Sequence, residues 1–576
     1  MPIQNTDISH IFNHIADLLE ISGANTFRVR AYRNAARTVE DQSRNIIKML
    51  EDGEDLAELP GIGKDLAGKI AEIAETGTLG MLDELEQEVP GELSRLLEIA
   101  QLGPKRVAAL YHELGIEGLE DLKKAAESEK VRDLEGFGKK TEQKILKELH
   151  RVQDSAKRTK LADAEQVVVP LCEYLEKIDG VKRVTVAGSY RRRRETVGDL
   201  DILVTCKKDS PIMERFTRYE AVTEILAQGK TKSSTRLRSG LQVDLRVVPE
   251  VSYGAALYYF TGSKAHNVAV RRIAVKKNLK MNEYGVFKDK EDDEERIAGS
   301  DEEDVFASVG LEFIPPELRE NRGEIEAAQE GRLPALIERD DIRGDLHSHT
   351  HATDGRASLQ EMVEAARLLG YSYLAITEHS QAVTVAKGLN RARLEKQIEE
   401  IEKLTDEYGG FRILKGIEVD ILKDGSLDLP DEVLAKLDFT ICSVHSHFNL
   451  SAEKQTERIL RAMDNPYFNI LGHPSGRLIN EREAYSLTME KIMEGAKERG
   501  IILELNAHPD RLDLNDHHCR MAKEMGIKIA INTDAHSTEG LNNMKYGIYQ
   551  ARRGWLSKDD VINTRKVADL LKFFKR

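Results

Sequence analysis

The sequence predicts a multidomain protein with an all-α N-terminal region, an α+β middle part and a C-terminal α/β domain built as a distorted barrel. Residues 1 to about 155 read as helices separated by short glycine-containing breaks. From about 160 to 265, short apolar runs rich in β-branched residues are typical of strands, and helical stretches separate them. From 341 to the end, short apolar strands alternate with helices, a pattern that indicates a barrel-like α/β domain.

The composition indicates a globular protein with several hydrophobic cores. The 576 residues suit about three to five domains of ordinary size, and 40% of them are hydrophobic while 32% are charged. The formal net charge of −15 argues against general attraction to nucleic acid. Basic patches on single domains remain compatible with it, because the sign of the charge can differ between domains.

The sequence also predicts the cellular compartment and the oligomeric state of the protein. It contains no apolar run long enough to span a bilayer and no signal peptide, so we expect a cytoplasmic protein that does not bind membranes. It has no clear oligomerisation signal, and a monomer is expected. Scattered cysteines without a CxxC pair predict a reducing compartment and no disulfide framework. These cysteines are Cys172, Cys206, Cys442 and Cys519.

A glycine-rich pattern recurs three times in the helical region, at 59–70, 99–110 and 134–145. Each copy has a helix end, a hairpin of the type Gly-hydrophobic-Gly, a lysine and another helix, although Gln101 replaces the first glycine of the middle copy. One such turn is an ordinary helix connection. Three copies resemble the helix-hairpin-helix motif, in which backbone N–H groups bind DNA phosphates. The candidate DNA-binding residues are Gly61, Gly63, Lys64, Gly103, Lys105, Gly136, Gly138 and Lys139.

Three aspartates mark the middle part of the chain. Asp199 and Asp201 are two apart in the run GDLDILV, so on a strand they point to the same face, and Asp244 lies in the second run LQVDLRV. If the two strands are neighbours, the three carboxylates converge and suit divalent cations that hold a triphosphate and activate a hydroxyl. Gly188 and Ser189 upstream fit a turn that approaches phosphates. The alternative is a set of solvated aspartates at strand edges.

The order of hairpin repeats, Gly-Ser turn, paired aspartates, third aspartate and YFTGS resembles the family X DNA polymerases over roughly residues 1–320. The resemblance implies that Asp199, Asp201 and Asp244 hold two Mg²⁺ or Mn²⁺ ions for the attack of a primer 3′-hydroxyl on an α-phosphate. It places Asp244 nearest the hydroxyl. It also implies contacts from Gly188, Ser189 and Arg192 to the β- and γ-phosphates.

A second motif, YYFTGSKAHNVAVRR, carries further implied contacts. In the family, positions matching Tyr259 and Phe260 contact the sugar, and Gly262 permits a tight turn. Asn267 and Arg271 match positions that probe the minor-groove edge of the new base pair. The alternative for the aromatic residues is packing in a core.

Lys69 matches the family position of a lysine that can form a Schiff base with the sugar left after base loss. Such a lysine needs a lowered pKa. A neighbouring position that carries lysine in lyase-active relatives is Asp65 here, which counts against the activity. Simple phosphate binding by Lys69 is the alternative.

The C-terminal part contains an ordered set of histidines and carboxylates. Most of them follow short apolar runs, so they should lie at the C-terminal ends of strands, which share one mouth in an α/β barrel. Such a set suits up to three Zn²⁺ or Mn²⁺ ions, with Glu418 as a bridge. Histidines outside the set, such as His351, His447 and His508, need no function. The nine candidate ligands are His347, His349, Asp354, His379, Glu418, His445, His473, Asp534 and His536.

This set resembles the PHP (polymerase and histidinol phosphatase) domain over about 341–576, with all nine expected positions filled. The resemblance implies metal-activated water that attacks a phosphoester. Next to a polymerase, the expected substrate is a DNA 3′ end, by 3′→5′ exonuclease or abasic-site cleavage. Small phosphate monoesters are the alternative substrate.

Together these patterns predict a family X polymerase with a PHP phosphoesterase, acting on gapped or primed DNA with deoxynucleoside triphosphates in DNA repair. The alternatives are a DNA-end-binding scaffold whose main activity is the nuclease or phosphoesterase, and a template-independent transferase. The expected divisions are a lyase-like helical domain (1–85), helix-hairpin-helix fingers (86–155), a nucleotidyltransferase palm (156–265), a thumb (266–320), a linker (321–340) and the PHP domain (341–576).

Overall fold

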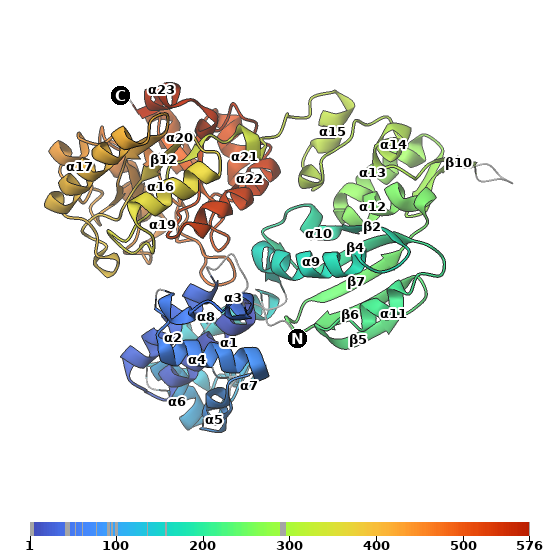
Figure 1. Ribbon diagram of the computed structural model, residues 1–576, viewed down its shortest axis with the longest axis horizontal. Coiled ribbons are helices and arrows are strands. Elements are labelled where there is room, and N and C mark those ends of the chain that lie inside the picture. Colours follow the sequence, from blue (N-terminus) through green and yellow to red (C-terminus); the bar gives the residue numbers. More distant parts are fainter. Residues whose placement is uncertain are drawn as a thin grey trace. The chain divides into compact units, whose positions relative to one another are not determined.

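The computed structural model describes the chain except residues 1–4, 41–45, 52, 60, 77, 89–92, 94, 95, 98, 100, 101, 135, 156, 157, 289–294, 575 and 576. Gln101 and most of the acidic run at 288–296 therefore lie outside the described residues. Contacts divide the chain into two units, Met1–Thr159 with Asn480–Arg482, and Lys160–Ile479 with Glu483–Arg576 (Figure 1). Each unit is built around hydrophobic clusters of its own.

The N-terminal unit is helical over its described residues, as the sequence predicts. Its helices bury one apolar face each against a shared core that includes Phe12, Val107 and Leu122. The helices are α1 (Asn5–Ile21), α2 (Thr26–Glu40), α3 (Ile46–Glu51), α4 (Lys64–Thr76), α5 (Gly80–Glu88), α6 (Pro104–Leu114), α7 (Leu119–Glu127) and α8 (Lys139–Ser155).

The second unit begins with a five-stranded mixed sheet in the order β2-β4-β7-β6-β5. Its strands are β2 (Val181–Val186), β4 (Asp199–Cys206), β5 (Val222–Gln228), β6 (Lys232–Leu237) and β7 (Gln242–Val247). Leu200, Ile202 and Val204 alternate along β4 with no exposed surface, and they pack into one cluster with helix α9 (Leu161–Glu176). The period-2 pattern thus places Asp199 and Asp201 on the opposite face of β4.

Residues 250–330 add helices and a small antiparallel sheet, β10-β9-β8. Their cluster includes Val270, Phe306 and Ile325, so the predicted linker packs here through helix α15 (Glu324–Gln329). The elements are α12 (Tyr253–Thr261), α13 (Lys264–Lys276), β8 (Leu279–Asn282), β9 (Gly285–Lys288), β10 (Glu295–Ala298) and α14 (Glu302–Ser308).

The C-terminal part contains two parallel sheets, β11-β12-β13 and β14-β15-β16-β17-β18. The isolated bridges Ser348–Ala535 and His379–Glu418 link the two sheets at two places. Full closure into the expected barrel stays a prediction. The strands are β11 (Gly344–Asp345), β12 (Tyr373–Ile376), β13 (Arg412–Lys415), β14 (Glu418–Asp420), β15 (Ile441–Ser443), β16 (Ile470–Leu471), β17 (Ile502–Asn506) and β18 (Ile529–Asn532).

Both faces of these strands are buried, as parallel sheets require. Tyr373, Ile441 and Ile502 belong to an inner cluster, whereas Leu374 and Leu503 point into a larger cluster shared with the helices. The helices are α16 (Leu359–Leu368), α17 (Arg391–Glu407), α19 (Ala452–Ala462), α20 (Met489–Arg499), α21 (Asp516–Met525) and α22 (Met544–Arg553).

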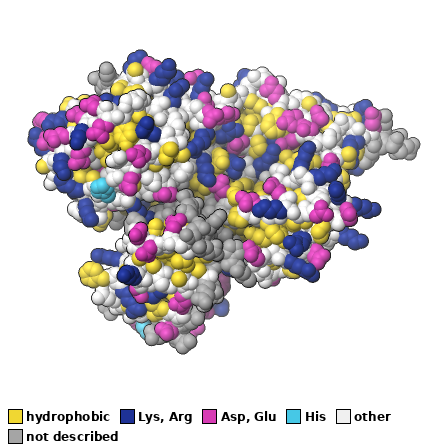
Figure 2. Space-filling model, in the orientation of Figure 1, with side chains coloured by type: hydrophobic (Ala, Val, Ile, Leu, Met, Phe, Trp, Pro, Cys, Tyr) yellow, Lys and Arg dark blue, Asp and Glu magenta, His cyan; other side chains and the backbone are white. Residues whose placement is uncertain are grey.

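Charge is mixed on the surface. On the face drawn in Figure 2, lysine and arginine lie among aspartate and glutamate, so the net charge of −15 is not spread as a uniform acidic coat. Among the described helices, none combines the length and the hydropathy needed to cross a membrane. A cytoplasmic location and a monomeric state stay predictions from the sequence.

Candidate active sites

The two aspartates of the first site come from neighbouring strands. β4 and β7 run parallel, and Asp201 is the register partner of Asp244. Burial, followed by the negative charges of Asp199 and Asp244, raises the pKa of Asp201 to about 6. The ionised form of Asp201 is therefore unfavourable by itself. A bound cation would stabilise this carboxylate, because it would offset both the burial and the repulsion from the other two aspartates. The predicted neighbourhood of the two strands is confirmed.

Asp244 is held by other side chains of the sheet. Its Oδ2 lies 3.0 Å from Lys232 Nζ, and Gln242 Nε2 donates to its Oδ1 at 3.0 Å. Burial alone would raise the pKa of Asp244, but bonds from Gln242, Lys232 and Ser234 lower it. Within the described chain, sets of three or more potential ligands with atoms inside 4.8 Å occur only in the histidine-rich part. The structure therefore places the palm carboxylates on adjacent strands, but it does not bring three of their oxygen atoms within 4.8 Å of one another.

Gly188 shapes the turn beside these aspartates. It opens α10 (Gly188–Arg191) with a φ of 63°, and a Cβ at this position would lie 2.9 Å from Asp201 Oδ2. A residue with a side chain would be strained in this left-handed backbone conformation, and its Cβ would also clash with the Asp201 carboxylate. The Ala187 amide donates to Asp201 O at 2.7 Å, which fixes the turn to β4.

The arginines after this turn are already paired. Arg191 makes a bidentate ion pair with the buried Glu302, at 2.9 and 2.8 Å. Arg192 donates from Nε to Glu320 Oε1 at 3.1 Å and from Nη1 to Thr261 O. Sequence reasoning missed Glu302 and Glu320, because both lie more than one hundred residues further along the chain.

The second motif packs around α12 and α13. Tyr259 and Phe260 meet edge to face at 5.1 Å, and the Arg271 guanidinium lies 6.0 Å from the Tyr259 ring. Asn267 donates to Tyr259 O at 2.7 Å and keeps a buried Oδ1 without a hydrogen-bond partner. Gly262 has a φ of 69°, and a Cβ there would lie 3.2 Å from Arg192 Nη1. The motif and the Gly188 turn therefore meet at Arg192.

The hairpins of the N-terminal unit share one geometry. Ile62, Leu102 and Phe137 each donate a backbone N–H to the carbonyl three residues before, at 2.9 to 3.0 Å. The following helices α4, α6 and α8 start at Lys64, Pro104 and Lys139. The described part of the middle hairpin thus has the same backbone hydrogen bond as the outer two, from Leu102 to Ile99. Proline at the first helical residue removes one N–H donor from it.

Lys69 on α4 pairs with Asp65 one turn earlier and lies 5.4 Å from the Tyr32 ring. Burial would lower the pKa of Lys69, but the contacts with Asp65 and Tyr32 outweigh it and raise that pKa. A Schiff-base lysine needs the opposite shift. The lyase role stays a prediction that this geometry does not support.

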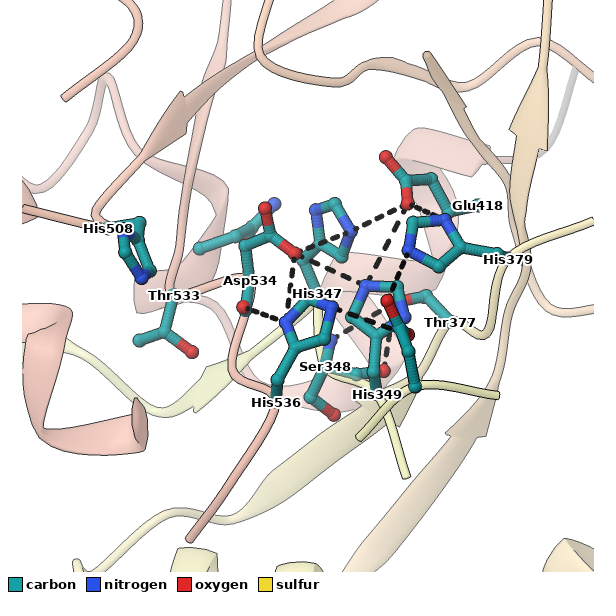
Figure 3. Close-up of polar contacts among 12 residues, drawn as sticks. His347, Ser348, His349, Thr377, His379, Glu418, His508, Thr533, Asp534 and His536 are labelled. Carbon is teal, nitrogen blue, oxygen red and sulfur yellow. Dashed lines mark hydrogen bonds and ion pairs between the residues drawn. The ribbon is translucent and has the colours of Figure 1, made fainter. Parts of the chain in front are cut away.

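The second site gathers residues from the ends of successive strands (Figure 3). His347 and His349 follow β11, His379 follows β12, Glu418 begins β14, and His445 follows β15. His473 follows β16, and Asp534 and His536 follow β18. The close groups are His349 with Asp354, His379 and His536; His347 with His349 and Asp534; and His379 with Glu418 and His445.

Glu418 occupies the centre of this site. It is 1% exposed, and its Oε2 lies 2.7 Å from His379 Nδ1 while its Oε1 lies 2.9 Å from His473 Nε2. His347, His349 and His445 approach the same carboxylate within 3.3 to 3.8 Å. His473 is the one predicted ligand outside the close groups. Its contact with Glu418 Oε1 nevertheless places it at the site.

The donors fit divalent metal ions. His347 Nε2, His349 Nε2 and Glu418 Oε2 are buried and make no well-aligned hydrogen bond in the described structure, although each lies within ion-pair distance of a neighbouring side chain. Buried donors of this kind are suited to an ion between them. Burial, with the nearby His536 and His379, lowers the pKa of His349 to about 3, which keeps this imidazole neutral. Neutral imidazole and carboxylate are ligands of Zn²⁺ and Mn²⁺.

Supporting carboxylates orient the histidines. Glu504 at β17 lies 2.7 Å from His347 Nδ1 and accepts from the His473 amide at 2.7 Å, and Asp420 lies 3.0 Å from His445 Nδ1. Such partners fix the ring nitrogen that faces a metal. Sequence reasoning missed both residues, although Asp420 ends β14 and Glu504 lies within β17. His351, His447 and His508 lie outside the close groups.

Sequence profiles of five known families match successive parts of the chain. They are Helix-hairpin-helix domain (3–79), SAM-like Helix-hairpin-helix tandem (93–151), DNA polymerase beta palm (158–276), DNA polymerase beta thumb (256–320) and PHP domain (345–508). Their order is the one that the sequence motifs predict.

Among curated proteins, the DNA polymerase/3′-5′ exonuclease PolX of Bacillus subtilis (strain 168) is 40% identical over 572 residues, which cover 99% of each chain. The chain belongs to the PolX group of family X polymerases. The predicted combination of helix-hairpin-helix, palm, thumb and PHP domains is thereby confirmed.

Other relatives match only the C-terminal part of this PolX-type chain. A probable phosphatase of Thermoanaerobacter sp. (strain X514) is 31% identical over 246 residues, which cover 40% of this chain and 96% of that protein. A probable phosphatase of Acetivibrio thermocellus is 32% identical over 201 residues, covering 33% of this chain and 78% of that protein. Part of this chain is thus similar to proteins named as probable phosphatases.

Proposed function

We propose that this chain is a DNA-directed DNA polymerase that fills short gaps in DNA repair, and that its PHP domain degrades DNA from the 3′ end. The observation that carries the proposal is the register pairing of Asp201 and Asp244 beside the Gly188 turn, in a chain with a PolX relative over its whole length. Its substrates are gapped or primed DNA and deoxynucleoside triphosphates.

In the palm, Asp199, Asp201 and Asp244 would hold two Mg²⁺ or Mn²⁺ ions. When bound, such ions position a triphosphate and lower the pKa of a nearby hydroxyl. Asp244 stays ionised through its bonds to Lys232 and Gln242 and faces the primer 3′-hydroxyl. The 3′-oxygen attacks the α-phosphate, so one phosphoester bond forms as one anhydride bond breaks and pyrophosphate leaves.

The turn and the second motif bind the incoming nucleotide. Gly188 and Ser189 offer backbone and hydroxyl groups to the β- and γ-phosphates, and Arg192 exchanges Glu320 for a phosphate. Tyr259 and Phe260 form an edge-to-face pair that carries the sugar. On α13, Asn267 and Arg271 face the minor-groove edge of the new pair, with Gly262 supplying the turn before them.

The hairpins hold the DNA backbone. Their glycines open the helix N-termini to phosphate oxygens, and Lys64, Lys105 and Lys139 add positive charge. The outer hairpins, with Gly61, Gly63, Gly136 and Gly138, bind more strongly than the middle one at Gly103, because Pro104 has no N–H.

In the PHP domain, the nine ligands would hold up to three Zn²⁺ or Mn²⁺ ions, with Glu418 at their centre. When bound, such ions activate water for attack on a phosphoester. Glu504 and Asp420 keep the imidazoles of His347 and His445 oriented. Removal of single nucleotides from a 3′ end is the main reaction, and cleavage at abasic sites would use the same chemistry.

A second candidate function is hydrolysis of small phosphate monoesters by the PHP domain, with the rest of the chain acting as a DNA-end scaffold. The names of the two probable phosphatases favour it. Hydrolysis of a chromogenic phosphate monoester by the full chain, faster than its release of nucleotides from DNA, would support this candidate.

The experiment that tests the proposal uses a one-nucleotide gapped duplex with a labelled primer, Mn²⁺ or Mg²⁺, and the four deoxynucleotides present or absent. We expect templated extension with nucleotides and shortening without them. Asp201→Ala should abolish extension and keep shortening, whereas His349→Ala should do the reverse. DNA binding without either activity would support the scaffold instead, and extension without a template would indicate a template-independent transferase.

A further inference from the structure

Helix α22 of the PHP domain contacts both the PHP strands and the palm. It follows Asp534 and His536 in the chain and packs against the PHP strands, because a Cβ on Gly547 would lie 2.6 Å from both Ala507 Cβ and Ile531 Cγ2. The helix also joins the cluster of the palm through Tyr546, which donates its hydroxyl to Glu165 at 2.6 Å. One helix thus connects the two domains within this unit.

The palm turn that α22 reaches is under backbone strain. Arg193 follows α10 with a φ of 55°, a conformation that residues with a side chain rarely adopt. Such a conformation persists only when the surroundings hold it. Within the turn, the Arg193 and Arg194 amides donate to Tyr190 O and Ser189 O at 2.9 and 3.1 Å. The turn also carries Arg192, for which we propose a phosphate contact.

Two residues of α22 contact this turn. Arg553 is 3% exposed in its side chain and donates from Nη1 to Arg192 O at 2.8 Å. The Tyr549 ring lies 4.3 Å from the Arg193 guanidinium, which is a cation–π distance. The PHP domain therefore supplies external contacts to both Arg192 and Arg193.

Arg553 also acts on the partner of Arg192. Its Nη1 lies 3.0 Å from Glu320 Oε1, the same oxygen that accepts from Arg192 Nε, while its Nη2 donates to Asp516 at 2.7 Å. Glu320 is thus shared among three guanidinium groups, those of Arg553, Arg192 and, at 3.8 Å, Arg194. Without Arg553, Glu320 Oε1 would have Arg192 Nε as its remaining close partner, and the Arg192 side chain would leave it for a phosphate less readily.

We infer that α22 is a positioning element of the nucleotide site, in which Arg553 and Tyr549 hold the Arg192–Arg193 turn in the shape that receives the triphosphate. The inference rests on the proposed polymerase function of the palm. It adds that the apparent affinity for nucleotide depends on residues of the hydrolytic domain. Neither residue touches substrate, so both act through the turn.

The test uses full-length protein on gapped DNA. Arg553→Met should raise the KM for deoxynucleotide about tenfold, with kcat and 3′ degradation within about twofold of wild type. Arg553→Lys should restore part of the loss, and Tyr549→Leu, which keeps apolar volume, should raise the KM in the same direction. Lys545→Ala is the matched control, because Lys545 joins the same helix to Glu165 on α9 rather than to Arg192 or Arg193.

The outcomes are distinct. Nucleotide KM values of folded Arg553→Met and Tyr549→Leu within about twofold of wild type would overturn the inference. An equal loss of kcat, degradation and thermal stability would also overturn it, because that pattern indicates only a structural role. If Arg553→Met does not fold, Tyr549→Leu alone decides. Failure of the wild-type protein to extend the primer would instead refute the proposed function.

Discussion

Substitution of Glu418 by glutamine should remove most of the 3′ degradation and leave nucleotide addition intact. The Glu418 oxygens lie between 2.7 and 3.8 Å from nitrogens of five imidazoles, and the side chain is 1% exposed. Glutamine has nearly the same shape. The substitution therefore removes a charge from the centre of the site while the packing around it is kept.

The magnitude follows from that geometry. Two unit charges about 4 Å apart interact by about 4 kcal/mol at an effective dielectric constant of about 20. A loss of about 4 kcal/mol corresponds to roughly a thousandfold in rate or in ion affinity. A divalent ion carries two charges, so its attraction to this carboxylate would exceed that between two unit charges at the same distance.

The assay follows a labelled primer on a gapped duplex, without nucleotides for degradation and with them for extension, together with the metal content of the purified protein. Glu402→Gln, at an exposed carboxylate of α17, is the control and should change neither activity. Degradation by Glu418→Gln within tenfold of wild type, with unchanged metal content, would refute the reasoning.

Three further predictions concern single residues. Gly188→Ala should lower nucleotide addition at least about tenfold while degradation persists, because its Cβ would lie 2.9 Å from Asp201 Oδ2 at a φ of 63°. Gly136→Ala, at a φ of 80°, should weaken DNA binding about threefold to tenfold, measured by fluorescence anisotropy across salt concentrations. Glu504→Gln should weaken metal affinity about 10- to 100-fold in competition with a chelator, because it frees the His347 ring.

Each of these has a contrary result. Wild-type extension by Gly188→Ala would mean that the turn does not need its close approach to Asp201. Unchanged DNA binding by Gly136→Ala would exclude this hairpin as a phosphate contact. A Glu504→Gln variant that retains metal as wild type does would show that His347 is oriented without it.

Local pattern predicted the elements that carry the chemistry. The period of two in GDLDILV places Asp199 and Asp201 on one face of β4, and the structure has that strand with Leu200 and Ile202 buried on the other. The histidines after short apolar runs were predicted to share one mouth, and parallel strands bring them together. In both cases the signal lies within a few residues of the chain.

The carboxylates that orient the site residues could not be predicted from local sequence patterns. Glu504 reaches His347 across 157 residues, and Glu320 reaches Arg192 across 128, so neither pair leaves a local pattern. The Asp65 contact with Lys69 is local, but its effect on the pKa depends on burial that the fold determines. Burial and long-range pairing are properties of the topology, which the motifs alone do not specify.

The bridge between Ser348 and Ala535 joins the first and the last strand ends of the PHP domain. Ligands from both ends of the domain, His347 and His349 with Asp534, form one of the close groups. An ion bound to this group would therefore hold the two ends of the domain together. At a free ion concentration one hundred times the Kd, it would stabilise the folded domain by about 2.7 kcal/mol per site. During synthesis, β18 must leave the ribosome before Asp534 can join His347 and His349. A chain that ends before β18 would therefore have a palm sheet but an incomplete set of ligands in the PHP domain.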